Sequence, residues 1–369
     1  MTITRTNAVG IPTECAAVML FEHGGPDALK YGVYSLRQPG PHDVVVDVHA
    51  IGVTGFDLKY RRGLLAHHQL PGRKLFPLPQ QLGREAAGVV HWVGSSVTTL
   101  SPGDHVVAVT HPEDPYGVET ARGLGNLSSG IDIPGHQSLG SYARYLIRDE
   151  RLWLKLSPSV DLEQAALTLW PFSTVHRILT DRLHVHLSDV VVILGSTGGM
   201  GIAAIQLVKL LGARPVAATR DLSKTPQLRE LGAVDVMDAR DLDAGLATLH
   251  ALTAGRGPDH VIDFAGNLDV LSAVASAMRV GGSICMGAAD ESAGQVPISV
   301  ADMIRFELNV LGIRGARRTD MLAALELLEH QQITIPVAHR FPLAQAVDAH
   351  ETMERGIRDV GRVLLKPER

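Results

Sequence analysis

The residues that point most directly to chemistry form one glycine-rich stretch in the middle of the chain. Five apolar residues from Val190 to Leu194 precede it, and apolar residues at helical spacing follow it from Ile202. A strand, a glycine turn and a helix N-terminus let free backbone N–H groups hold a pyrophosphate. The sequence therefore predicts that a dinucleotide contacts Ser196, Thr197, Gly198, Gly199, Met200 and Gly201.

The glycine pattern departs from the usual Gly-x-Gly-x-x-Gly form. It reads Ser196-x-Gly198-x-x-Gly201, with Gly195 one place earlier. An ordinary strand-to-helix turn is the alternative interpretation. The strand before the turn, the helix after it and a second strand at 215–219 favour the nucleotide site.

The end of that second strand distinguishes NAD from NADP. An acidic residue there would bind the ribose hydroxyls and repel a 2′-phosphate. Thr219 takes the position, and Arg220, Ser223 and Lys224 follow it, which favours NADP(H) over NAD(H). Two observations keep the alternatives open: Arg220 and Lys224 also suit a solvated helix start, and Asp221 favours NAD.

Composition excludes several classes of function. The 369 residues carry a net charge of −5, and the basic residues form no cluster, so neither nucleic acid nor an anionic membrane is an expected partner. Two distant cysteines, Cys15 and Cys285, cannot build a disulfide framework or a thiolate zinc site. This cysteine usage makes a reducing cytoplasm the default expectation, with a small molecule as the substrate. No stretch reaches the length of a membrane span, and the apolar run 15–21 is too short for a signal peptide.

Two kinds of segment must position these residues. Residues 1–14 are predicted to be a loose extension, and residues 15–158 show short β-rich runs and turns, such as 44–53, 85–93 and 105–110. Within them, 111–141 is poor in apolar residues and is expected to be a long excursion over the surface or a cleft.

From residue 161 onward, strands alternate with helices, which predicts a doubly wound parallel sheet. A helix is expected from Glu163 to Leu179, capped by Ser159 or Asp161 and interrupted near Pro171. The last helices and strand do not extend the alternation. We therefore predict one domain from residues 1–160 and 313–369, and an inserted domain from 161–312.

Several motifs in this order resemble the medium-chain dehydrogenase/reductase superfamily, and the likeness covers the chain from Cys15 onward. The motifs are Ala50–Asp57, Leu82–Val90 with Val93-Gly94, Pro102–Val106, Gly140–Ala143, the glycine turn and Val280–Gly282. The resemblance implies an α/β protein with a Rossmann doubly wound parallel sheet inserted in a β-rich GroES-like catalytic domain. It also implies a homodimer, Met286, Gly287 and Ala288 beside the nicotinamide ribose, and Arg362 near the pyrophosphate. A surface arginine is the alternative for Arg362.

The departures from zinc alcohol dehydrogenases concern their metal ligands. The resemblance places Thr54, Arg84 and Trp170 where those enzymes carry Cys, His and Cys, and Phe56 where their relay hydroxyl lies. Thr and Trp are not zinc ligands, and Arg brings a permanent positive charge. The segment matching the structural zinc lobe contains no cysteine, so we expect no zinc. The pair His67-His68 is interpreted as a solvated loop, with metal binding as the alternative.

Candidate groups for the reaction are Thr54, Tyr60 and Arg84, with Phe56, Tyr142 and Trp170 around the substrate. Tyr60 is expected to hydrogen-bond or protonate a reduced intermediate, as in similar enoyl reductases, or else to be an amphipathic ring near the cleft. Arg84 is expected to pair with a carboxylate, and Trp170 to shape a pocket wall.

The absence of a Lewis acid favours a substrate that delocalises charge by itself, such as an enone, enoyl thioester or quinone. The first hypothesis is thus a zinc-independent NADPH-dependent oxidoreductase of the quinone oxidoreductase-like or enoyl reductase-like branch. The second is a zinc-free carbonyl reductase or alcohol dehydrogenase. The third is a cofactor-binding protein without turnover.

Overall fold

The structure is a computed structural model that describes residues 5–6, 10–65, 74–288 and 296–368. The chain forms two compact units, the first from residues 1–170, 316–358 and 362–369, and the second from 171–315 and 359–361. The first unit thus ends at Trp170 and resumes after Gly315, whereas the sequence predicted domain boundaries after residues 160 and 312. Helix α3 (Leu162–Arg177) begins in the first unit and ends in the second.

The second unit is built on a six-stranded sheet in which every pair of neighbouring strands is parallel. Its strands are β9 (Val190–Leu194), β10 (Arg214–Thr219), β11 (Asp235–Asp238), β12 (His260–Asp263), β13 (Ser283–Met286) and β14 (Asn309–Gly312). Their order is β11-β10-β9-β12-β13-β14, so the winding reverses between β9 and β12. Ligands of such sheets bind outside the carboxyl ends of the strands at that reversal.

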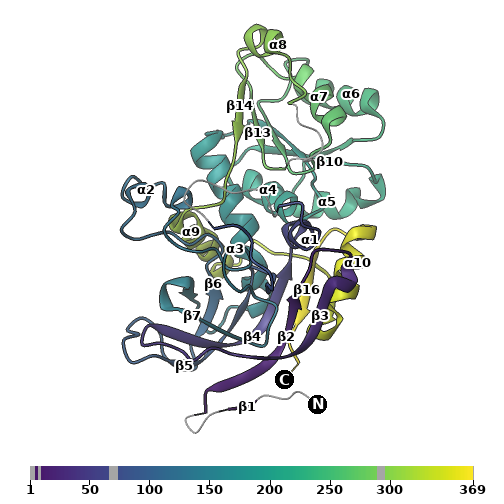
Figure 1. Ribbon diagram of the computed structural model, residues 1–369. Coiled ribbons are helices and arrows are strands. Elements are labelled where there is room, and N and C mark those ends of the chain that lie inside the picture. The colour runs from purple at the N-terminus through teal and green to yellow at the C-terminus, as the bar shows by residue number, and fades with distance from the viewer. Residues whose placement is uncertain (1–4, 7–9, 66–73, 289–295, 369) are drawn as a thin grey trace. The chain divides into compact units, whose positions relative to one another are not determined.

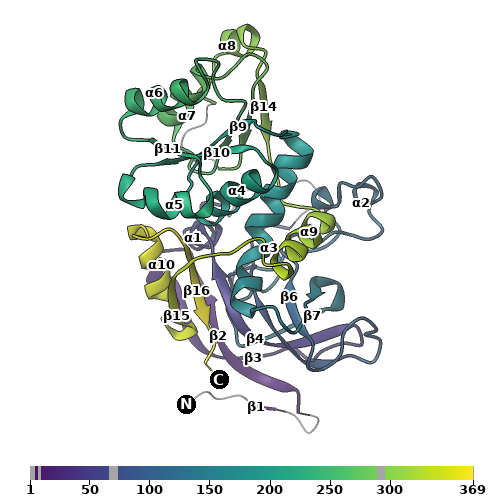
Figure 2. The same ribbon diagram turned by 180° about the vertical axis from the view of Figure 1, so that it is seen from behind.

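Helices cover both faces of this sheet, as Figures 1 and 2 show, with α4 and α5 on one face and α6 and α7 on the other. The helices of this unit are α4 (Gly199–Leu210), α5 (Thr225–Leu231), α6 (Leu242–Leu252), α7 (Leu268–Ser276) and α8 (Val300–Arg305). Every residue of β9 is buried, which explains its unbroken apolar run. The predicted doubly wound parallel sheet is confirmed.

The first unit contains a seven-stranded sheet and a three-stranded sheet. The larger sheet comprises β4 (Asp43–Val53), β5 (Ala87–Val93), β6 (His105–Ala108), β7 (Tyr145–Asp149), β8 (Trp153–Lys155), β15 (Val337–Pro342) and β16 (Arg362–Lys366). The smaller comprises β1 (Arg5–Thr6), β2 (Pro12–Leu20) and β3 (Leu29–Ser35). The predicted loose extension over 1–14 is wrong in part, because β1 pairs with β2 and β2 begins at Pro12.

The helices wholly in this unit are α1 (Gly55–Arg61), α2 (Val118–Ala121), α9 (Arg318–Glu329) and α10 (Ala346–Arg355). The predicted cap of α3 is present, since Asp161 Oδ1 accepts from Gln164 N at 2.9 Å. The predicted interruption is wrong, because α3 continues through Pro171 and ends in a π-helical turn over Ile178–Arg182. Within the described ranges, no helix is long and apolar enough to cross a bilayer.

Candidate active site

Helix α1 starts the site, and Thr54 is its N-cap. Thr54 Oγ1 accepts from Asp57 N at 3.3 Å, and Asp57 Oδ2 accepts from both Thr54 N and Thr54 Oγ1 at 2.8 Å. This reciprocal arrangement is a capping box. The hydroxyl proton of Thr54 is therefore already donated to a carboxylate, which removes Thr54 from the groups that can donate a proton to a substrate.

Asp57 connects α1 to the loop that carries Arg84. Its side chain is buried, and Oδ1 accepts from Gly83 N at 3.1 Å. Burial raises the pKa of the Asp57 carboxyl, while hydrogen bonds from Thr54 and Gly83 and the charge of Arg84 oppose that shift. Because donors face both oxygens, the geometry is that of an ionised carboxylate.

The guanidinium of Arg84 lies among three aromatic rings. Its Cζ is 4.7 Å from the ring centroid of Trp170, 5.5 Å from that of Tyr60 and 6.0 Å from that of Phe56. Phe56 is also 5.4 Å from Trp170, centroid to centroid. These four residues form the Arg84 box. Arg84 and Trp170 are each 8% exposed and Tyr60 is 4% exposed, whereas Phe56 is 39% exposed and is the most accessible member.

Arg84 makes one side-chain hydrogen bond within the described ranges, from Nη2 to the hydroxyl oxygen of Tyr60 at 2.8 Å. The predicted carboxylate pairing is wrong in detail: the charge of Arg84 acts on Asp57 without a hydrogen bond, and among the described residues Arg84 forms no ion pair within 4.0 Å. Nε of Arg84 is buried and has no partner among these residues. A buried donor without a partner is costly, so a ligand acceptor at this position would be stabilised.

Three further rings, which the sequence analysis missed, pack against Trp170 and Tyr60 of the box. The ring centroid of His111 is 5.0 Å from that of Trp170, and His136 is 4.9 Å from Tyr60. Phe76 stacks on Tyr60 at 5.1 Å, with the ring planes 8° apart. No local pattern signals these residues, because each comes from a loop whose course the sequence does not determine.

Tyr142 is placed differently from the sequence-based expectation that it surrounds the substrate. Its ring is fully buried, and its hydroxyl lies 2.9 Å from Nε2 of His350 on α10. Arg61 Nη1 donates to Nδ1 of the same histidine at 3.1 Å, and Arg61 also pairs with Glu354. Burial and the Arg61 charge lower the pKa of His350 to about 3. Tyr142 therefore belongs to a structural network.

Arg362 is also placed differently from the expectation. It lies on β16, is 7% exposed and donates to Glu85 Oε2 at 2.5 Å, with further contacts to the main-chain oxygens of Val53 and Leu167 at 3.4 Å. Burial raises the pKa of the Glu85 carboxyl to about 7, and the charge of Arg362 opposes that shift. Arg362 is therefore neither a surface arginine nor free to reach a pyrophosphate, because its guanidinium is held in this buried ion pair.

Of the three positions matched to zinc ligands, Arg84 and Trp170 lie together, with Arg84 Cζ 4.7 Å from the Trp170 ring centroid, and Thr54 is the N-cap of α1. Thr, Arg and Trp are not residue types that ligate zinc. Across the ranges that the structure describes, no group of three or more His, Cys, Asp or Glu side chains could hold a metal ion. His67 and His68 lie outside the described residues. The arrangement at Arg84 offers a fixed positive charge and hydrogen-bond donors instead of a metal's coordination positions.

In the second unit, the glycine turn has the geometry that a dinucleotide needs. Gly195 adopts a left-handed φ of +80°, and a Cβ on Gly201 would overlap the main chain of Gly195 and Ser196. Gly198 is the N-cap of the 12-residue helix α4 and has no side-chain cap, and a Cβ there would meet nothing. These residues bring the backbone N–H groups at the start of α4 to an open surface, which suits a pyrophosphate.

Not every predicted turn residue offers its side chain. Ser196 is fully buried, and its hydroxyl donates to the carbonyl oxygen of Ala218 at 2.8 Å, so it joins the turn to β10. Thr197, Gly199 and Met200 are partly exposed along the same turn. Met286 ends β13, and the N–H groups of Gly287 and Ala288 donate to Asp263 O at 2.8 and 3.0 Å. These three residues lie at the carboxyl edge of the sheet that carries the glycine turn.

The end of β10 carries both signs of charge. Asp221 accepts from the N–H and the hydroxyl of Ser223, at 3.1 and 2.6 Å, and these bonds lower the pKa of its carboxyl. Thr219 Oγ1 accepts from Asp221 N at 3.1 Å. The hydroxyl of Ser223 is thus directed to Asp221, which weakens its predicted role as a phosphate ligand.

Arg240 is a cation that the sequence analysis missed. It follows β11, whose end is joined to β10 by Ala239 N donating to Thr219 O at 2.9 Å. Arg240 and Lys224 both act electrostatically on Asp221, and Arg220 is exposed beside it. The sequence does contain a signal for Arg240, because it follows the strand next to β10 and the carboxyl ends of neighbouring parallel strands meet at one edge of the sheet.

Comparison with known proteins gives two matching family models. The alcohol dehydrogenase GroES-like domain matches residues 40–158, and the zinc-binding dehydrogenase model matches residues 199–330. Among curated relatives, quinone oxidoreductase of Homo sapiens is 25% identical over 356 residues, covering 95% of this chain and 97% of that protein. Sorbitol dehydrogenase of Gallus gallus is 30% identical over 333 residues, covering 87% and 89%.

Solved structures agree in fold. The cobalt- and zinc-bound thermostable alcohol dehydrogenase from Pyrobaculum aerophilum superposes with a TM-score of 0.83 at 27% identity, covering 96% of this chain and 100% of that one. The similar structures therefore include a metal-bound protein. This chain carries Thr54, Arg84 and Trp170 at the positions that the resemblance matches to zinc ligands.

Proposed function

Because this chain belongs to the medium-chain dehydrogenase/reductase superfamily, we propose that it is a zinc-independent, NADPH-dependent reductase of an activated C=C bond or a quinone. The observation that carries the proposal is the Arg84 box, in which the Arg84 guanidinium lies 4.7 Å from Trp170. The resemblance to zinc alcohol dehydrogenases matches both residues to metal ligands of those enzymes. Its family supports an oxidoreductase that uses a nicotinamide cofactor. The substrate class, the phosphate preference and the independence from zinc are our proposals.

The residues of the Arg84 box would stabilise the negative charge that develops on the substrate oxygen. When bound, the reduced nicotinamide supplies the hydride. Addition at the β-carbon of a conjugated carbonyl moves the electron pair to the oxygen. Arg84 offers an orphaned Nε–H toward that oxygen and holds the Tyr60 hydroxyl at 2.8 Å, and a fixed donor of this kind contributes roughly 3 kcal/mol to transition-state stabilisation.

The 2′-phosphate of NADPH would be held by three cations at the ends of β10 and β11. These are Arg220, Lys224 and Arg240. Asp221 supports NADH instead, but its carboxylate is already bound by the Ser223 hydroxyl and N–H, which reduces its capacity to accept ribose hydroxyls. The balance of charge therefore favours NADPH.

The test is a cofactor-oxidation assay on the purified full chain with an enone, a quinone and a saturated ketone, together with a determination of bound zinc. We expect NADPH-dependent turnover of the enone or quinone, no stoichiometric zinc and no loss of rate with a chelator. Turnover of the ketone alone would favour the carbonyl reductase instead. Cofactor binding without turnover of any substrate would favour a binding protein.

Two variants test whether the charge of Arg84 itself is needed for turnover. Arg84→Gln is expected to lower kcat about 100-fold with little change in the affinity for NADPH. The substitution removes the positive charge that would stabilise the negative charge developing on the substrate oxygen in the transition state. Arg62→Gln is the matched control, because the side chain of this arginine is 48% exposed and pairs with Glu354 rather than with the Arg84 box. Equal rates in both variants would overturn the role of Arg84.

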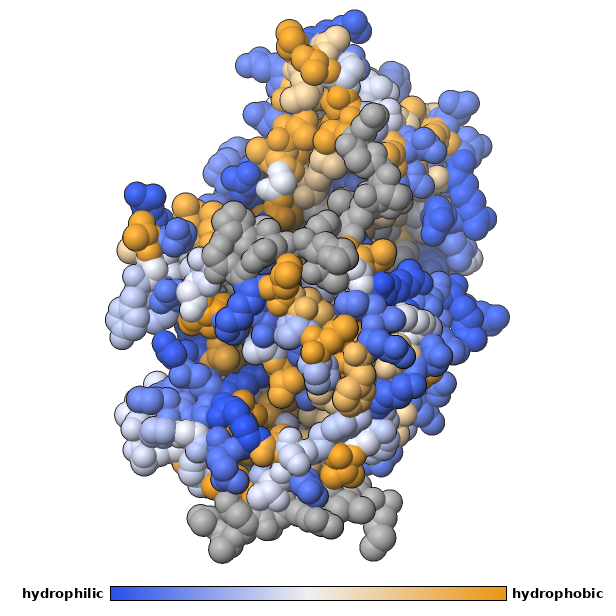
Figure 3. Space-filling view, viewed as in Figure 1, coloured by the Kyte–Doolittle hydropathy of each residue, from blue (hydrophilic) through white to orange (hydrophobic). Residues whose placement is uncertain are grey.

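A homodimer through the edge of the Rossmann sheet is a further part of the proposal. Strand β14 is the last in its sheet, so one row of its main-chain groups is unpaired there. Val300 and Ile304 of α8 are 71% and 77% exposed, and Figure 3 shows apolar side chains gathered over this end of the unit. Light scattering should give twice the chain mass, and Val310→Pro, which breaks the edge strand, should give a monomer.

A further inference from the structure

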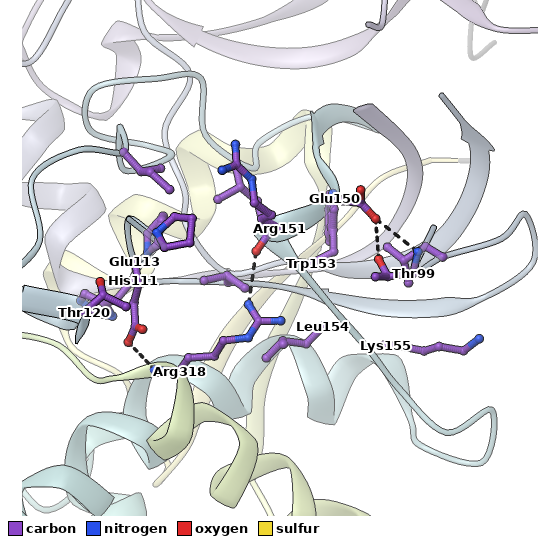
Figure 4. A pocket seen from close by; sticks show the side chains of 16 residues that line it. Thr99, His111, Glu113, Thr120, Glu150, Arg151, Trp153, Leu154, Lys155 and Arg318 are labelled. Atoms are coloured by element: carbon purple, nitrogen blue, oxygen red, sulfur yellow. Dashed lines mark hydrogen bonds between the residues drawn. The ribbon is translucent and has the colours of Figure 1, made fainter. Parts of the chain in front are cut away.

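The first unit contains a cavity that the proposed reaction does not use. Its volume is about 540 Å³, within the range of roughly 300–1,000 Å³ typical of small-molecule sites. Figure 4 shows it between the segment around His111 and Glu113, strand β8 and the start of α9. All of these elements belong to one compact unit.

Most of the wall is apolar and firmly held. Leu100, Val109, Trp153 and Leu154 line the cavity, and each is between 2% and 6% exposed. Val109 N donates to Leu152 O at 2.9 Å, and β6 pairs with β8, so this part of the wall is continuous with the seven-stranded sheet. The wall is therefore formed before any ligand binds, which reduces the ordering cost of binding.

The two lining carboxylates already have partners. Glu150 Oε2 accepts from the N–H groups of Thr98 and Thr99 at 3.2 Å and from the Thr99 hydroxyl at 2.7 Å. Glu113 Oε1 accepts from the main-chain N–H of Arg318 at 2.5 Å. Neither therefore lacks a donor, and neither requires a cationic ligand.

Among the lining cations, Arg318 differs from the others. Arg151 pairs with Asp149 at 2.8 Å, and Lys155 pairs with Asp104 at 2.8 Å. Within the described part of the chain, the Arg318 guanidinium contacts only the carbonyl oxygen of Arg151, at 3.4 Å. Figure 4 shows this side chain reaching from α9 into the space between His111 and Trp153.

Two lining side chains also keep a buried polar atom without a partner among the described residues. These atoms are Oγ1 of Thr120 and Nε1 of Trp153. Native proteins leave few buried polar atoms unsatisfied, and such atoms commonly mark a bound water or ligand. Among the described residues, the cavity thus combines apolar walls, an exposed arginine without a carboxylate partner and two buried polar atoms without partners.

We propose that this cavity is a binding site for an amphipathic monocarboxylate. The carboxylate would pair with the Arg318 guanidinium, whose planar donors match it, and the apolar body would lie against Val109 and Leu154. The site is distinct from the Arg84 box but adjoins it: the ring of His111, which lines the cavity, is 5.0 Å from Trp170. A ligand here would therefore contact a residue that supports the box without entering the reaction.

The test is calorimetric titration of the full chain with octanoate. Two further probes are titrated for comparison: butyrate, which lacks the long apolar body, and 1-octanol, which lacks the charge. We expect octanoate to bind at least about tenfold more tightly than either probe, because each lacks one of the two interactions. Arg318→Gln should remove the preference for octanoate over 1-octanol and leave NADPH affinity unchanged. Arg355→Gln, which changes an arginine that is 72% exposed on α10, is the matched control.

Three results would overturn the proposal: no octanoate binding at millimolar concentration, equal affinity for octanoate and 1-octanol, or an Arg318→Gln variant that binds octanoate as the parent does. Because the titration uses no reducible substrate, its outcome is independent of whether the reductase activity proposed above is found.

Discussion

His350 gives the sharpest prediction about stability, because it is buried in neutral form between two fixed groups. Arg61 can only donate, so Nδ1 of His350 accepts from it, and Nε2 carries the hydrogen that is donated to the Tyr142 oxygen. A second proton would have to lie against the Arg61 guanidinium in a fully buried site. Burial and that charge lower the pKa of His350 to about 3, from about 6.5 in an unfolded chain.

The sign of the pH dependence follows from this shift. Between pH 6.5 and 3, the unfolded chain binds a proton that the folded chain does not, so the free energy of unfolding falls as the pH falls. Each pH unit in that window costs about 1.4 kcal/mol, so the contribution of His350 at pH 4.5 is about 3 kcal/mol smaller than at pH 7.

The assay is urea unfolding of the parent and His350→Phe from pH 7 to pH 4.5, followed by tryptophan fluorescence. The three tryptophans, Trp92, Trp153 and Trp170, lie in the same unit as His350, so the signal reports that unit. At pH 7 the variant is expected to be less stable, since Arg61 and Tyr142 lose a partner. The difference should shrink by about 3 kcal/mol at pH 4.5.

An exposed histidine provides the control. His330 ends α9 at the surface of the same unit, and His330→Gln should show no such change in its stability difference with pH. A difference between parent and His350→Phe that stays constant or grows on acidification would refute the neutral, buried state of His350.

Three further predictions concern the second unit. Asp259→Asn should lower the free energy of unfolding of this unit by about 3 kcal/mol, because Asp259 binds Arg256, Arg279 and Val190 N. Urea unfolding followed by circular dichroism measures the change. A loss under 1 kcal/mol would contradict this. Gly201→Ala should abolish NADPH binding in a fluorescence titration, since its Cβ overlaps the turn; retained affinity would refute the assigned turn geometry. Arg240→Ala should raise the Kd for NADPH about tenfold and leave that for NADH unchanged, and an equal change in both would remove Arg240 from the phosphate site.

The sequence predicts the second unit well because its signals are local. A buried strand, a glycine turn and a helix lie consecutively in the chain, and the structure confirms β9, the turn and α4 in that order. Even Thr54 had a local signal: the spacing Thr54-x-x-Asp57 is typical of a capping box, and the structure shows both of its hydrogen bonds.

The contacts that changed the site assignments are non-local. Tyr142 and His350 are 208 positions apart, and Glu85 and Arg362 are 277 apart. Nothing in the sequence near Tyr142 indicates that its hydroxyl will form a hydrogen bond with a histidine on α10. Partners of this kind are determined by which elements pack together, so spacing alone could not separate a pocket tyrosine from a buried one.

The charge of the Arg84 box narrows the kind of substrate that it suits. Arg84 carries one positive charge, and the buried Asp57 carboxylate, held by donors from Thr54 and Gly83, carries one negative charge beside it. The local sum is near zero, so an anionic substrate gains little net attraction on binding. A neutral conjugated carbonyl suits the site better, because negative charge then appears only as hydride adds and meets donors that are already oriented. Stabilisation confined to the transition state raises kcat without tightening ground-state binding. This reasoning favours the neutral enone or quinone over a charged enoate, and adding an enoate to the substrate panel separates the two.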